Sequence, residues 1–178
     1  MKFTLSILTI LLFVLVAFGQ EESDKGIELY EQGNYTGAIT VLQNVVQADK
    51  KNRDAWFHLG MSFAKTGKNN QAVKALRKGD SISSINSSGY DKELRIISKP
   101  HARYTDSARQ NLTAGKVKLA IEFVENGQIK LIVPIQILPD GLTGNCITAA
   151  QNIKFEPAYK NGKAVSSIKV IEYTFEIR

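Results

Sequence analysis

Cysteine, histidine and proline are all scarce in this chain of 178 residues, and their scarcity excludes several kinds of site. The single cysteine, Cys146, cannot form an intrachain disulfide. The two histidines, His58 and His101, lie far apart with no HxxxH or HExxH spacing, so the sequence shows no recognisable metal-binding motif. The sequence also lacks a GxxxxGK[ST] phosphate loop and a GxSxG turn. We therefore predict a protein that is not an enzyme and uses no cofactor.

The surroundings of Cys146 favour a packing role over a reactive one. Five small or apolar residues recur at helical spacing around it: Leu142, Cys146, Ala149, Ala150 and Ile153. A nucleophilic thiol needs a nearby histidine or a helix end to lower its pKa, and this stripe supplies no histidine. Free cysteine packs as a small hydrophobe, and we expect Cys146 to lie in a core.

Only the start of the chain carries a long apolar run. Residues 3–18 are almost entirely apolar, Lys2 precedes them, and Ala17 and Gly19 occupy the minus three and minus one positions before Gln20. This pattern predicts a signal peptide over residues 1–19. A retained membrane anchor is the alternative, and membrane contact is expected only in that case. The remaining residues work outside the cytoplasm under either interpretation.

The formal net charge of +6 is concentrated in the second half of the chain. Seven basic residues between Lys92 and Lys118 face only Glu93 and Asp106. We expect a solvated basic linker, with contact to an anionic lipid or an acidic partner as the alternative. Nucleic acid is not an expected partner, because an exported protein rarely meets it.

The first half contains an internal repeat with a period of thirty-four residues. Four positions recur at that offset: Gly26, Gly33, Ala38 and Leu42 return as Gly60, Gly67, Ala72 and Leu76. Each unit is typical of a helical hairpin, with one glycine at the helix crossing and a second in the turn. The repeat predicts two hairpins over residues 20–81.

These hairpins resemble tetratricopeptide (TPR) repeats, through Trp56, Leu59, Gly60, Phe63 and the packing Ala72. The resemblance implies a groove for a peptide, lined by Ile27, Tyr30, Asp54, Phe57, Met61 and Lys65. For Phe57 and Met61, packing against a neighbouring element is the alternative. Two repeats leave an open end. We expect a helix over Tyr90 to Ile97, within a linker of residues 82–99, to cap that end.

From Lys116 onward the apolar period changes from helical to alternating. Alternation from Val117 to Phe123 predicts a strand, "ENG" a turn, and residues 129–137 a second strand. Pro134 there indicates an edge position or a bulge. After the helix that holds Cys146, "KNG" indicates another turn, and residues 165–177 a last strand. Ile168 and Val170 fall on the opposite parity to the strand's other apolar residues, which predicts a bulge or two covered faces.

The second half resembles the C-terminal domain of TonB, the periplasmic energy transducer of Gram-negative bacteria. Several pieces carry the resemblance in order: Pro100, Tyr104, "GKVKL", "NGQI", "AAQNIKFEPA", "NGKAV", Tyr173 and Phe175. The resemblance implies two helices on a three-stranded antiparallel sheet over residues 100–178. The whole chain is then α+β, with all-α TPR hairpins preceding the TonB-like domain, and is periplasmic or secreted, or anchored in the inner membrane and facing the periplasm.

The resemblance also implies a partner. TonB domains bind the plug region of outer-membrane receptors, whose extended segment adds beside the last strand. Here the receiving strand would be Ile168 to Ile177, with contacts from Ile168, Lys169, Val170, Ile171, Glu172, Tyr173, Thr174 and Phe175. Further contact candidates lie between Lys99 and Tyr104.

Three functions remain open on the sequence alone. The first is a protein-binding envelope protein that joins a receptor to a TPR ligand. The second is an anchored energy transducer, although the four prolines, none before Pro100, provide no proline-rich spacer. The third is a structural module that associates with copies of itself through unpaired strands or open repeats.

Overall fold

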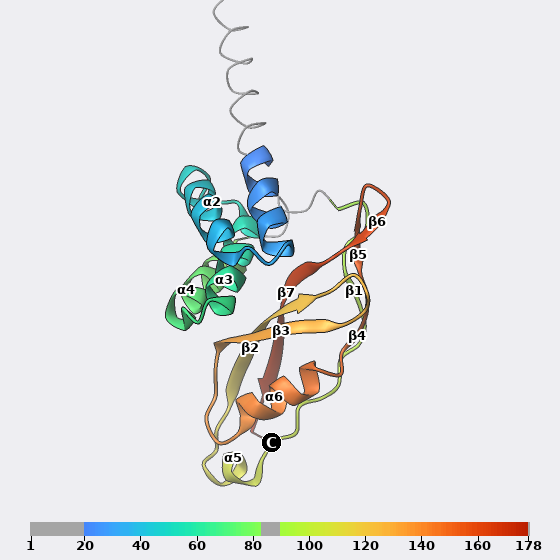
Figure 1. Cartoon of the computed structure of the whole chain (residues 1–178). Helices are drawn as coiled ribbons and strands as arrows, with labels where there is room; N and C mark the ends of the chain where they lie inside the picture. Colours follow the sequence, from blue (N-terminus) through green and yellow to red (C-terminus); the bar gives the residue numbers. More distant parts are fainter. Residues whose placement is uncertain (1–19, 83–89, 178) are drawn as a thin grey trace, which may run out of the picture. The chain divides into compact units, whose positions relative to one another are not determined.

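The computed structural model describes residues 20–82 and 90–177 (Figure 1). The chain divides into two compact units, Met1–Ser87 and Ser88–Arg178. The signal peptide or anchor predicted for residues 1–19 lies outside the described residues. Within residues 20–82 and 90–177, none of the helices combines the length and the hydrophobicity needed to cross a membrane.

The described part of the first unit consists of four helices: residues 20–31, α2 (Tyr35–Ala48), α3 (Arg53–Lys65) and α4 (Asn69–Asp80). Asparagine side chains cap two of them, because Asn34 accepts from the Gly37 N–H and Asn52 from the Ala55 N–H. The predicted pair of helical hairpins is confirmed.

Glycine at the helix crossings lets the paired helices approach closely. A methyl group built on Gly60 would lie 2.5 Å from Leu76 Cγ, and one on Gly26 would lie 2.6 Å from Leu42 Cδ2. Both distances are far below van der Waals contact, so a side chain at either position forces the neighbouring leucine or the helix that carries it to shift. The thirty-four-residue repeat therefore reflects a packing requirement that each hairpin meets separately.

The second unit is built on a three-stranded antiparallel sheet, as predicted. Its strands are β2 (Gly115–Phe123), β3 (Ile129–Gln136) and β7 (Ser167–Phe175), in the order β3-β2-β7. The two predicted helices are α5 (Asp106–Gln110) and α6 (Leu142–Ala150). The core lies between one face of the sheet and α6, and alternate residues of β2 enter it: Val117, Leu119, Ile121 and Phe123.

Two small ribbons complete the second unit (Figure 1). β1 (Arg95–Ser98) pairs with β4 (Lys154–Glu156), and β5 (Ala158–Lys160) pairs with β6 (Lys163–Val165). In the β5–β6 turn, Asn161 and Gly162 have φ of 53° and 71°, which is typical of a tight hairpin turn.

The helix expected over Tyr90 to Ile97 as a cap on the repeats is wrong. Residues from Arg95 onward form β1, and Leu94 is buried in the core of the second unit. The backbone of this segment bonds instead to β4, about sixty residues further along the chain. The β-sheet unit therefore begins before Pro100.

Candidate functional site

Strand β7 lies at one edge of the three-stranded sheet. Within the described residues β2 is its neighbour on one side, and no strand pairs with it on the other. The register with β2 runs without a bulge from Gly115 opposite Phe175 to Phe123 opposite Ser167. A regular edge strand of this length presents unpaired backbone groups to any extended segment that approaches it.

The β2–β3 hairpin shows which backbone groups of β7 face outward. The Val124 N–H donates to the Gln128 carbonyl at 2.8 Å, and the Val124 carbonyl accepts from the Gly127 N–H at 2.9 Å. Both backbone groups of Val124 therefore point towards β3, and those of Phe123 towards β7. Continued through the β2–β7 register, this alternation turns the N–H and C=O of four residues to the open edge: Ile168, Val170, Glu172 and Thr174.

The opposite edge of the sheet, β3, is interrupted. Pro134 has no N–H to donate, and the β2–β3 register slips beside it and again between Glu122 and Phe123. Pro134 thus lies both at an edge and at a bulge, the two options that the sequence left open. Of the two edges, β7 is the one suited to receiving a strand.

The eight residues predicted for contact on β7 differ in exposure. Ile171, Tyr173 and Phe175 are buried in the core, whereas Lys169 and Thr174 are exposed. Ile168 is buried and Val170 half-buried on the other face of the sheet. Because the register has no bulge, the parity of these two residues reflects their place on the face of the sheet opposite the core. A partner strand would therefore bond mainly to backbone, with few side chains of β7 free to contact it.

The segment from Lys99 to Tyr104, also predicted for contact, touches β7 through its two ends. Lys99 Nζ donates to the Glu172 carbonyl at 3.0 Å and lies 4.9 Å from the centroid of the Tyr173 ring. The Tyr104 ring stacks on Phe175 with centroids 5.7 Å apart. Residues far apart in sequence thus meet beside the open edge.

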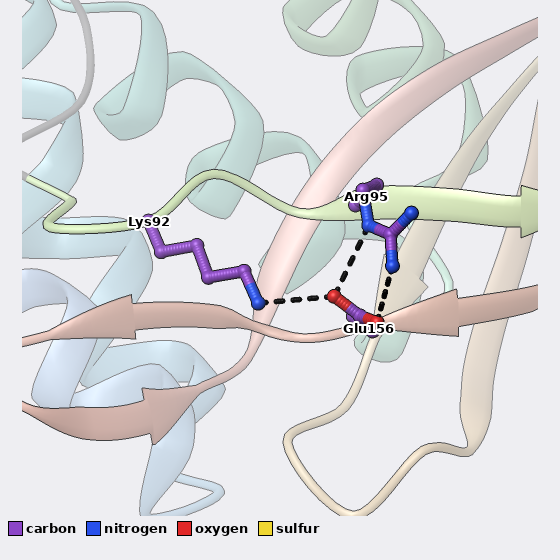
Figure 2. Close-up of polar contacts among 3 residues, drawn as sticks. All are labelled: Lys92, Arg95 and Glu156. Carbon is purple, nitrogen blue, oxygen red and sulfur yellow. Dashed lines mark hydrogen bonds and ion pairs between the residues drawn. The ribbon is translucent and has the colours of Figure 1, made fainter.

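A charge cluster on the surface joins Glu156 of β4 to Lys92 and to Arg95 of β1, the strand that leads into this segment (Figure 2). Glu156 Oε2 accepts from Lys92 Nζ at 3.0 Å and from Arg95 Nε at 3.1 Å, and Arg95 also pairs with the second carboxylate oxygen. The hydrogen bonds from Arg95 and then Lys92 lower the pKa of Glu156 to about 2. The sequence did not predict this cluster, because Glu156 lies 64 residues from Lys92 and 61 from Arg95 and the three carry no motif.

The residues predicted to line the helical groove fall into two sets. Tyr30, Phe57 and Met61 are buried, and the Arg53 guanidinium lies 4.5 Å from the centroid of the Phe57 ring. For Phe57 and Met61 this is the packing arrangement that the sequence left as the alternative. Three residues are partly exposed and remain predicted groove contacts: Ile27, Asp54 and Lys65.

Two family models match this chain. Residues 26–67 match the model described as TPR repeat, and residues 100–177 match the model described as Gram-negative bacterial TonB protein C-terminal. The chain carries a TPR repeat and a TonB C-terminal domain. Modules of these two kinds are typically non-catalytic and bind proteins.

One solved structure that resembles the TonB C-terminal domain is the solution NMR structure of the Pseudomonas aeruginosa TonB CTD. The two sequences are 22% identical, and the match covers 54% of this chain and 94% of that chain with a TM-score of 0.40. A comparison with curated proteins found no match.

Cys146 lies in the core of the TonB C-terminal domain and is fully buried, in agreement with the packing role predicted for it. Burial raises the pKa of its thiol to about 11, which keeps the thiol protonated at neutral pH. Within residues 20–82 and 90–177, the histidine, cysteine and acidic side chains form no cluster of three or more that could hold a metal ion.

Proposed function

We propose that this protein is a non-enzymatic binding protein of the cell envelope, acting in the periplasm. Its TonB C-terminal domain takes up an extended segment of a partner along β7, and the partner that the family suggests is an outer-membrane TonB-dependent receptor. The TPR hairpins recruit a second protein, with Ile27, Asp54 and Lys65 as contacts from the exposed part of the groove.

The observation that supports strand addition is the outward direction of four backbone N–H and C=O pairs on β7. Apart from β2, no backbone group among the described residues bonds to β7. An added strand would satisfy these groups in the way that a fourth sheet strand does, so affinity would come from the backbone. Because β3 is interrupted by Pro134 and by two register shifts, β7 is the edge better suited to pairing with an added strand.

A second candidate function is a membrane-anchored energy transducer of the TonB type. The apolar run of residues 3–18 suggests it, because a retained run of that length lies close to the lower limit for a membrane span. N-terminal sequencing of the protein isolated from cells separates the two. A mature chain that starts at Gln20 excludes the anchor, whereas a chain that keeps residues 1–19 favours the transducer.

Replacing Val170 with proline tests strand addition at β7. The Val170 N–H faces the open edge, so Val170→Pro removes one donor from a partner strand and leaves the hydrogen bonds to β2 in place. We expect the unmodified protein to recover an outer-membrane receptor from envelope extract, and Val170→Pro to recover none. Val170→Ala, which keeps the N–H, is the matched control and should recover the receptor.

Thermal unfolding must first show that Val170→Pro is folded. If it is not, Thr174→Pro removes another outward N–H closer to the strand end and replaces it in the experiment. Recovery of the receptor by a folded proline variant, equal to that of the unmodified protein, would exclude strand addition at this edge.

A further inference from the structure

One side chain lies across the open edge of β7. The Lys99 ammonium donates to the carbonyl of Glu172, one of the four residues whose backbone faces outward. The same ammonium lies over the ring of Tyr173, the next residue of the strand. Lys99 therefore occupies an acceptor that a partner strand needs for its own N–H.

The position of Lys99 is held from both sides. On one side β1 ends at Ser98 and is fixed to β4 by its ladder and by the Arg95–Glu156 pair (Figure 2). On the other side the stacking of Tyr104 on Phe175 holds the chain near the end of β7. A lysine between two such anchors stays within reach of the edge.

The segment around Lys99 does not itself complete the sheet. Pro100 has no N–H, and no backbone hydrogen bond joins residues 99–104 to β7. The contact is thus a single hydrogen bond from an exposed side chain, which an incoming backbone N–H can replace. Lysine at an open edge is also a means by which proteins discourage pairing between copies.

We propose that Lys99 is a gate on the receiving edge of β7. In the free protein its ammonium caps the Glu172 carbonyl, and a partner strand pairs along the full edge only after displacing it. The gate rests on the strand addition proposed above. Lys99 lowers the affinity of β7 for an uncharged strand, because the strand forms one backbone hydrogen bond to the Glu172 carbonyl only after the charged hydrogen bond from Lys99 is broken.

A neutral strand probe tests the gate on the protein purified from the envelope. The probe is a synthetic peptide of alternating threonine and valine, acetylated and amidated so that it carries no charge. Lys99→Met keeps the apolar stem over Tyr173 and removes the donor, whereas Lys99→Arg keeps charged N–H donors and is the control for the loss of the donor. We expect Lys99→Met to bind the probe about threefold or more tightly than the unmodified protein. Lys99→Arg should bind the probe with the same affinity as the unmodified protein.

NMR titration gives the affinity and, from the amide signals of Val170 and Glu172, the place of binding. Val170→Pro should abolish binding at that place. Lys99→Met that binds no more tightly, while Val170→Pro still prevents binding, overturns the gate and leaves strand addition standing. A gain in Lys99→Arg equal to that in Lys99→Met also overturns it. No binding to any variant overturns both ideas, since Lys99→Met then presents an unobstructed edge that accepts no strand.

Discussion

At the scale of single residues, the first unit, called the TPR unit below because it carries the TPR repeat, contains a buried histidine that its repeat motif does not explain. His58 in α3 is 7% exposed, its Nδ1 lies 2.8 Å from the Asp54 carbonyl, and its ring packs edge-on against Tyr30. Since a carbonyl only accepts, Nδ1 carries the proton in the neutral ring. Burial lowers the pKa of His58 to about 4, although the hydrogen bond to Asp54 acts in the opposite direction.

This lowered pKa predicts a dependence of stability on pH. The folded pKa is about 4 and the unfolded value is 6.5, so the unfolded chain takes up the proton first as pH falls. The contribution of neutral His58 to the free energy of unfolding is therefore complete above pH 6.5 and is lost progressively towards pH 4. It totals on the order of 3 kcal/mol. Urea unfolding followed by fluorescence of Trp56, also in α3, should show the TPR unit less stable at pH 4.5 than at pH 7.

The matched variant is His58→Gln, whose amide N–H₂ group keeps a donor for the Asp54 carbonyl but does not titrate in this range. Other carboxylates titrate in both proteins, so the informative quantity is the difference between their pH profiles. We expect a flatter profile for His58→Gln. Identical profiles would mean that His58 does not determine the pH response.

At the scale of elements, the helical hairpins were predictable because their requirement is local. Each hairpin needs a glycine where its helices cross, and the thirty-four-residue spacing of Gly26 and Gly60 shows that need in the sequence. The short strands were not predictable in the same way. Arg95 to Ser98 has no pattern that separates a strand from a helical turn, and only its pairing with β4 decides the matter.

Gly60→Ala tests the helix crossing. The added methyl group would lie 2.5 Å from Leu76 Cγ and 3.1 Å from the Leu76 backbone nitrogen, so α3 and α4 must separate. We expect a loss of about 1–3 kcal/mol in the free energy of unfolding of the TPR unit. Gly144→Ala in α6 is the control, since a methyl group there meets nothing within 4 Å and should leave the free energy of unfolding of its own domain, the TonB C-terminal domain, equal or slightly higher. Equal effects of the two changes would contradict a close crossing at Gly60.

At the scale of the whole molecule, the candidate site depends on strand order, which no single stretch of sequence contains. That β7 lies at an edge follows from β2 pairing between β3 and β7, and the outward direction of Val170 and Glu172 follows from the register. The sequence pointed to the last strand only through its resemblance to TonB domains. The contact of Lys99 with Glu172 spans seventy-three residues and became visible only in the folded unit.

The two units have separate cores, which predicts that they unfold as separate units. Asp140 offers a way to weaken the TonB C-terminal domain alone. It has φ of 58°, its carboxylate accepts from Asn111 and Thr113, and its carbonyl accepts from Thr105 at 2.6 Å. Asp140→Ala removes the two carboxylate contacts and puts alanine in a left-handed conformation, at a cost of about 2–3 kcal/mol.

We expect Asp140→Ala to raise the rate of amide hydrogen exchange in β2 and to leave the unfolding transition seen by Trp56 unchanged, because Trp56 reports the TPR unit alone. Asp140→Asn, which tolerates positive φ and keeps one side-chain oxygen acceptor, should have a smaller effect on β2. If Asp140→Ala lowers the free energy of unfolding reported by Trp56 as much as the free energy obtained from exchange in β2, the two units unfold together. A partner bound at β7 would then also stabilise the TPR unit, whereas separate transitions confine that stabilisation to the domain that binds it.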